Sequence, residues 1–160
     1  RIIKPFYWKY PMYKFVSFRE LKNLSRDTYL KHLQDGIITV WVDEETPFGY
    51  IPLEAIRCDN IVVGKIPETV PEWMEDENGI KNNGLWVYNI NEIPEMIAKA
   101  IGSWMRNEVP ENLLGEMNKT KELYTLDMWR KNVIETFDNI VDEQITTFTE
   151  VKNNIEKTEE

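Results

Sequence analysis

The stretch "IITVWVDEETPFGYIPLEAIRCDNIVVG" (residues 37–64) decides the fold. It opens with an apolar run, 37–42, which is typical of a strand buried on both faces of a sheet. A loop follows, then a short helix predicted from Pro52 to Cys58, and a second apolar run at 60–64. Because strand, helix and strand succeed one another through short connections, we expect parallel strands joined by a right-handed crossover.

The same alternation continues on both sides of this stretch. Further predicted elements are strands at 13–18 and 84–88 and helices at 25–36 and 91–105. Ser25 has the character of an N-cap, and Pro94 falls in a first helical turn, where no amide hydrogen is required. From about Leu123 the apolar residues keep a helical spacing to 155, which predicts a helix longer than a small sheet needs.

The predicted fold class is therefore α/β, a Rossmann-like parallel sheet with helices on both faces, followed by a long C-terminal helix. We expect a domain over 1–122, and the helix with a polar tail over 123–160. A length of 160 residues and a hydrophobic content of 42% suffice for one domain with a core. The sequence has no apolar run of ~20 residues, so no transmembrane segment is predicted.

Composition excludes several classes of site. A net charge of −9 argues against non-specific nucleic-acid binding, although residues 1–33 carry eight bases and two acids and can hold a small anion. The single cysteine, Cys58, excludes an intrachain disulfide and fits a reducing cytoplasm. The single histidine, His32, excludes a histidine-rich metal site. We expect both residues to be structural, and no metal or cofactor is predicted.

The loop after residue 42 is the candidate binding site, because ligands of open parallel sheets bind beyond the carboxyl ends of the strands. Gly49 permits a close approach of backbone to ligand, or a positive φ. The N-terminus of the next helix suits a phosphate. Glu54, expected near the third helical position and ionised by the helix dipole, suits the vicinal hydroxyls of a ribose. The alternative is that Glu54 only stabilises its helix and Gly49 only serves the loop.

The stretch "PFGYIPLEAIRCDNIVVG" (47–64) resembles the donor-binding signature of glycosyltransferases with the GT-B fold, especially the retaining group that includes glycogen and sucrose synthases. Phe48-Gly49, Glu54-Ala55 and the apolar run 61–63 occupy matching places. The segment "NGIKNNGLWVYNINEIPEMIAKAI" (78–101) resembles the next part of that family. The resemblance extends over residues 15–107.

The resemblance implies an incomplete GT-B C-terminal domain in which Glu54 binds the ribose and the Phe-Gly loop lies near the diphosphate and sugar. Thr46 stands where the family has a glutamate that contacts the donor sugar, and Glu45 or Glu44, just before it, can substitute for that glutamate if the loop is one residue tighter. The implied donor-binding residues are Glu45, Thr46, Phe48, Gly49, Tyr50 and Glu54. Lys65, directly after the strand at 60–64, is a further candidate that faces the same cleft or is simply solvated. The family's diphosphate-binding Arg/Lys pair is not assigned.

The predicted function is the donor half of a glycosyltransferase that moves a hexose-type sugar from UDP or GDP to a saccharide or lipid-linked acceptor. By the same resemblance this chain is expected to need an N-terminal domain upstream of Arg1 and to be inactive alone. No catalytic residue is assigned, and retention of configuration is implied by the resemblance only. We expect a cytoplasmic location, with peripheral contact at the inner membrane surface as an option.

The alternative function is a non-catalytic α/β protein-interaction module that uses its aromatic N-terminal segment and its long C-terminal helix. The segment "KPFYWKYPMYKF" (4–15) is expected to be an irregular crossing whose aromatic side chains pack under neighbouring helices. Contact with a sugar or a membrane is the competing interpretation of this segment.

Overall fold

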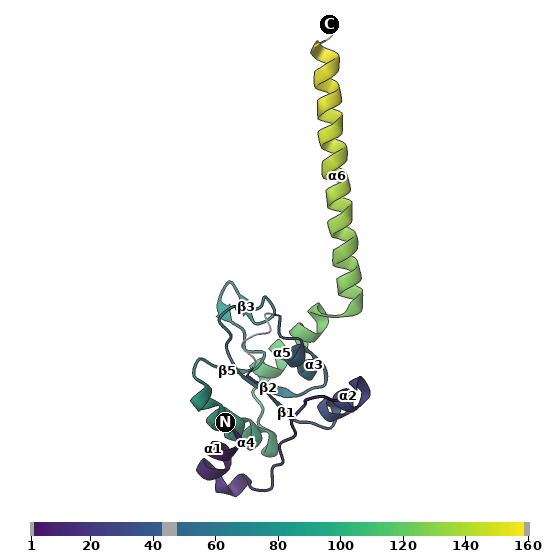
Figure 1. Ribbon diagram of the computed structural model, residues 1–160. Helices are drawn as coiled ribbons and strands as arrows, with labels where there is room; N and C mark the ends of the chain where they lie inside the picture. Colours follow the sequence, from purple (N-terminus) through teal and green to yellow (C-terminus); the bar gives the residue numbers. More distant parts are fainter. Residues whose placement is uncertain (1, 43–47, 159–160) are drawn as a thin grey trace. The chain divides into compact units, whose positions relative to one another are not determined.

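The structure, a computed structural model, describes residues 2–42 and 48–158, with side chains as far as residue 147. The chain divides into two units, Arg1–Lys121 and Glu122–Glu160, which we call the sheet unit and the helical unit. Figure 1 shows the elements of both.

The sheet has three parallel strands, β1 (Ile38–Trp41), β2 (Ile61–Lys65) and β5 (Leu85–Val87), in the order β1-β2-β5. The central strand β2 is buried from its first residue to Gly64, as expected for a strand covered on both faces. The α/β class and the parallel pairing predicted from residues 37–64 are confirmed.

Helices α3 (Tyr50–Arg57) and α4 (Ile93–Met105) pack on the sheet, and α2 (Arg26–Gln34) precedes β1 along the chain. In Figure 1 the strands lie between α3 on one side and α4 with the N-terminal helix α1 (Ile3–Lys9) on the other. The Ser25 hydroxyl caps α2 by accepting from the Thr28 amide at 3.3 Å, as predicted. A 3₁₀ turn, η2 (Ile90–Glu92), leads into α4, whose apolar side supplies much of the core.

The N-terminal segment differs from the prediction. It forms a helix, α1 (Ile3–Lys9), and a 3₁₀ turn, η1 (Pro11–Tyr13), and the strand predicted at 13–18 is wrong. Phe6 is fully buried, and its ring is the centre of an aromatic cluster with Tyr7, Tyr10, Tyr13 and Phe18. These residues favour a strand by propensity, but here they pack on one another's rings instead.

Between β2 and β5 the chain forms a short antiparallel hairpin, β3 (Glu75–Asp76) with β4 (Gly79–Ile80). Three tryptophans from this region and the sheet, Trp41, Trp73 and Trp86, pack with ring centroids 5.8 to 6.4 Å apart. Gly64 makes room for them, because a Cβ there would lie 2.8 Å from the Trp86 ring. The cluster fills the end of the core beside the loop that precedes α3.

Two more helices complete the chain. Helix α5 (Glu111–Leu123) was not predicted, because Gly115 interrupts its pattern and only Leu113, Met117 and Thr120 are buried along it. Helix α6 (Leu126–Thr158) has 33 residues and confirms the long helix expected from about residue 123.

Candidate functional site

The beginnings of α2 and α3 enclose an open hollow of about 430 Å³. Arg26 opens α2 and Ile51 is the second residue of α3, so the hollow lies where both helices start. Since α3 follows the end of β1, this is the carboxyl-end side of the sheet, where ligands of such sheets bind. The hollow is lined by Leu21, Asn23, Leu24, Arg26, Tyr29, Ile51 and Glu54.

Glu54 is the predicted site residue that lines this hollow, and both of its carboxylate oxygens have partners. Arg26 Nη2 lies 2.5 Å from Glu54 Oε1. The Tyr29 hydroxyl donates to Glu54 Oε2 at 2.7 Å. The guanidinium of Arg26 also lies over the Tyr29 ring, 5.5 Å from its centroid. The three side chains therefore form one connected group, which we call the Arg26–Tyr29–Glu54 cluster.

This cluster keeps Glu54 ionised. Partial burial by itself raises the pKa of Glu54, but the hydrogen bonds from Arg26 and Tyr29 and the charge of Arg26 outweigh it and hold the pKa below its ordinary value. Burial, and then the hydrogen bond to Glu54, raise the pKa of the Tyr29 phenol, so this group remains a donor at neutral pH. The hollow thus presents one fixed anion beside one cation.

The source of the negative charge differs from the prediction. The helix starts at Tyr50, earlier than expected, so Glu54 is its fifth residue and the first turn contains no acid. The field of the helix dipole falls off within the first turn. Arg26 and Tyr29, rather than the dipole, therefore stabilise the carboxylate. Sequence reasoning missed both partners, since nothing in "SRDTY" (25–29) marks a contact with a residue 25 or more positions later.

Gly49 has a positive φ, +66°, which is one of the two options considered for it, and it is the N-cap of α3. A Cβ there would lie 3.1 Å from the rings of both Trp41 and Trp73, so the tryptophan cluster fills the inner side of this turn. Trp73 Nε1 also donates to the Phe48 carbonyl at 2.5 Å. The turn is therefore anchored on the core, and only its outer side is available to a ligand.

The other predicted donor residues that the structure describes are not among those that line the hollow. The Phe48 and Tyr50 rings contact each other with centroids 4.8 Å apart, and Tyr50 is 64% exposed. Lys65 is the half-buried last residue of β2. Glu45 and Thr46 lie outside the described residues.

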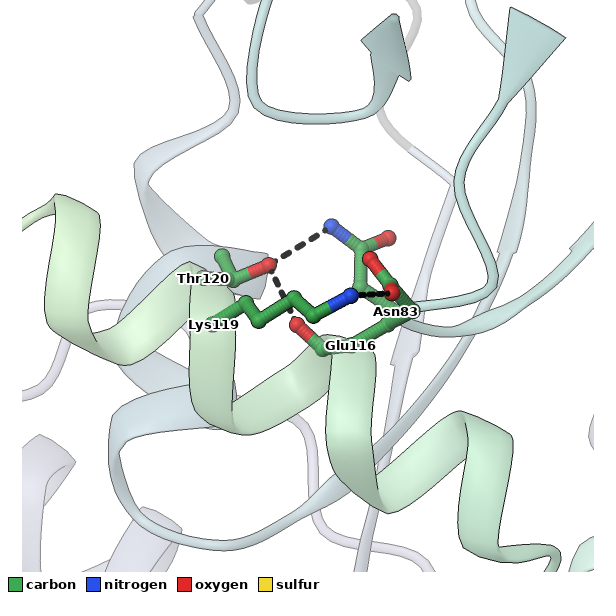
Figure 2. Close-up of polar contacts among 4 residues, drawn as sticks. All are labelled: Asn83, Glu116, Lys119 and Thr120. Carbon is green, nitrogen blue, oxygen red and sulfur yellow. Dashed lines mark hydrogen bonds and ion pairs between the residues drawn. The ribbon is translucent and has the colours of Figure 1, made fainter. Parts of the chain in front are cut away.

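A second, more polar hollow of about 400 Å³ lies between the β3–β4 hairpin and α5. Figure 2 shows two of its lining residues, Lys119 and Glu116, which pair at 2.6 Å. Beside it, buried Asn83 donates through Nδ2 to the Thr120 hydroxyl at 3.1 Å and to the Trp73 carbonyl at 2.8 Å. Its Oδ1 accepts from Trp86 Nε1 at 3.1 Å. Asn83 has partners for its donors and its acceptor, which indicates that this region serves the structure.

The remaining titratable candidates are consistent with structural roles. Burial, with the charges of Glu54 and Asp59, raises the pKa of the Cys58 thiol, which keeps it protonated and unreactive. His32 Nδ1 lies 3.0 Å from Arg19 Nη1 on a partly exposed side of α2. Across residues 2–42 and 48–158, no helix combines the length and apolar character that a membrane span requires.

Comparison with known protein families, curated protein sequences and solved structures gives no match to this chain.

Proposed function

We propose that this chain is the donor-binding half of a glycosyltransferase, and that the hollow between α2 and α3 takes the nucleoside diphosphate of a nucleotide-sugar. The observation that carries the proposal is the Arg26–Tyr29–Glu54 cluster, an ionised and oriented carboxylate on the wall of an open hollow. Its place at the carboxyl-end side of a parallel sheet supports the proposal, as does the similarity of residues 47–64 to the GT-B donor signature.

The chemistry of the cluster matches the two polar parts of a nucleoside diphosphate. A carboxylate has about four lone-pair positions, and Glu54 uses two of them in the contacts above, so it can still accept from a ribose diol. Arg26 has a side chain that is 62% exposed and five donors in a planar fork, which suits a phosphate. The apolar walls formed by Leu21, Leu24 and Ile51 suit the faces of a base.

On this proposal, ligand binding replaces the Arg26–Glu54 ion pair with two contacts, one from Arg26 to the diphosphate and one from Glu54 to the ribose. The diphosphate draws Arg26 away from Glu54, and the carboxylate that is released accepts the ribose hydroxyls while Tyr29 keeps it oriented. A ligand that lacks the anion leaves the Arg26–Glu54 pair closed, and a ligand that lacks the diol opens the pair without replacing it. The hollow therefore selects ligands that carry both groups.

Titration calorimetry with UDP, GDP and their sugar conjugates tests the proposal. A hydrogen bond to a charged group is worth about 1.5–3 kcal/mol, so Glu54→Gln is expected to weaken binding of the preferred nucleotide roughly tenfold or more. The 2′-deoxy form of the same nucleotide should lose much less affinity on this substitution. Arg26→Ala should weaken the binding of the nucleoside diphosphate but leave the weak binding of the free nucleoside unchanged.

The matched control is Glu92→Gln, which alters an exposed glutamate outside the hollow. Circular dichroism establishes that each variant is folded. Nucleotide binding that Glu54→Gln leaves unchanged would overturn the ribose assignment, and failure of the wild-type chain to bind any nucleotide would overturn the proposed function.

The helical unit favours a second candidate function, a protein-interaction module. Trp129, Ile134 and Phe137 on α6 are each at least 60% exposed. Large apolar groups exposed along one helix are typical of a binding surface. This candidate is compatible with the first, because it concerns a different unit of the chain. The cytoplasmic location and the contact with a membrane surface remain predictions under both candidate functions.

A further inference from the structure

Helix α6 exposes apolar side chains in a regular pattern. Over residues 126–147, where side chains are described, Trp129 is 61% exposed, Phe137 64%, Ile140 48% and Val141 51%. They belong to a set of nine apolar residues that recur at helical spacing from Leu126 to Phe148, which we call the α6 stripe. A helix in water gains little from such residues unless another surface covers them.

The spacing of the α6 stripe is symmetric about Phe137. Apolar residues stand 3, 4, 8 and 11 positions before Phe137 and again 3, 4, 8 and 11 positions after it. A second copy of the helix, turned to run in the opposite direction about Phe137, places each of these residues opposite its counterpart. The pairs are Leu126 with Phe148, Trp129 with Ile145, Val133 with Val141, Ile134 with Ile140, and Phe137 with Phe137.

The charged residues are compatible with this arrangement. Arg130, seven positions before Phe137, lies on the side of the α6 stripe, and its counterpart seven positions after Phe137 is the neutral Gln144. The acids Glu135 and Asp142 lie on the side of the helix away from the stripe. No position from 126 to 148 meets a like charge in this arrangement. A parallel pair in register instead places Arg130 on the stripe against its own copy, which costs electrostatic energy.

We propose that two copies of this chain associate through α6 as an antiparallel helix pair, with a two-fold axis at Phe137. Each copy contributes the same surface, as a two-fold interface requires. The charge of the helix argues against a membrane surface as the alternative occupant, because residues 126–147 hold five acids and two bases and anionic lipids attract basic helices. This inference is independent of the nucleotide proposal.

Sedimentation equilibrium of the full chain over a range of concentrations tests the association. We expect a monomer–dimer equilibrium for the wild type. Phe137→Glu places two carboxylates against each other on the axis and is expected to raise the dissociation constant roughly a hundredfold. The matched control is Phe15→Glu, because Phe15 is 67% exposed in the sheet unit against 64% for Phe137. A wild-type chain that stays monomeric, or equal effects of the two substitutions, would overturn the proposal.

Disulfide crosslinking tests the direction of the helices. With Cys58→Ser as background, Val133→Cys and Val141→Cys are made in separate chains that are then mixed and oxidised. The antiparallel pair forms a crosslink between the two different chains and little within either preparation alone. Crosslinking of each variant with itself indicates a parallel pair, and would overturn the antiparallel arrangement.

Discussion

The two units use the same kind of residue in opposite ways. In the sheet unit Trp73 is fully buried and Trp41 is 3% exposed, whereas Trp129 on α6 is 61% exposed. The sheet unit buries these two rings within its own fold and pairs the polar atoms of Asn83 inside its core, although other apolar side chains of this unit, such as Trp8 and Phe15, are exposed. In α6 the backbone groups bond within the helix, but the α6 stripe is largely exposed. The first unit therefore has a core of its own, while α6 leaves a row of apolar side chains exposed.

The largest expected effect is on the free energy of unfolding, and it is found by substituting one tryptophan from each unit. Trp73→Ala should lower the free energy of unfolding of the sheet unit by about 3–5 kcal/mol, because it removes a buried ring and leaves a cavity. Trp129→Ala should change the same quantity by less than about 0.5 kcal/mol, since that ring is exposed. Urea unfolding followed by circular dichroism measures both. Similar losses for the two variants would contradict the contrast between the units.

A polar residue tests whether the sheet unit also depends on its internal hydrogen bonds. Asn83→Ala removes the partners of Trp86 Nε1, the Thr120 hydroxyl and the Trp73 carbonyl. Leaving buried groups unpaired should cost about 2–3 kcal/mol in the same urea experiment. Asn82→Ala, at an exposed neighbouring position, is the control and should be nearly neutral. A neutral Asn83→Ala would mean that water replaces these contacts.

The smallest expected effect concerns the candidate site and depends on pH. Tyr29→Phe removes a hydrogen bond to the Glu54 carboxylate, so it should raise the pKa of Glu54 and cost about 1 kcal/mol of stability at pH 7. The pKa of Glu54 is depressed in the folded chain. The stabilisation is thus present above the ordinary glutamate pKa and lost as pH falls through the lowered value.

Urea unfolding of wild type and Tyr29→Phe at neutral and at acidic pH measures this dependence, and the difference should shrink in acid. Tyr50→Phe, which alters a 64% exposed residue on α3, serves as the control. A difference that is the same at both pH values would show that the Tyr29 hydroxyl does not act through the ionised form of Glu54.

The sequence predicts those parts of the fold that local patterns determine. Apolar runs identified β1 and β2, and Pro94 with its apolar spacing identified α4. Gly49 was correctly expected to allow a positive φ. The strand predicted at 13–18 failed because strand propensity describes packing on a sheet, and the aromatic side chains here pack on α1.

The candidate site was predictable only in part. Glu54 was identified from its place after the loop, but the start of α3 was misjudged because the positive φ of Gly49 lets the helix begin at Tyr50. The contacts of Arg26 and Tyr29 with Glu54 depend on how α2 packs beside α3, which local sequence does not encode. The symmetry of the α6 stripe is present in the sequence, but it becomes interpretable once the helix is known to be continuous.

The bond from Trp73 to the Phe48 carbonyl gives the chain an optical reporter of its own loop. Indole fluorescence responds to the polarity and hydrogen bonding around the ring, and Trp41 and Trp86 lie close enough to exchange excitation with Trp73. Any molecule that displaces residues 48–50 therefore changes the emission of these rings. A titration can be followed by light alone, with no label attached to the chain.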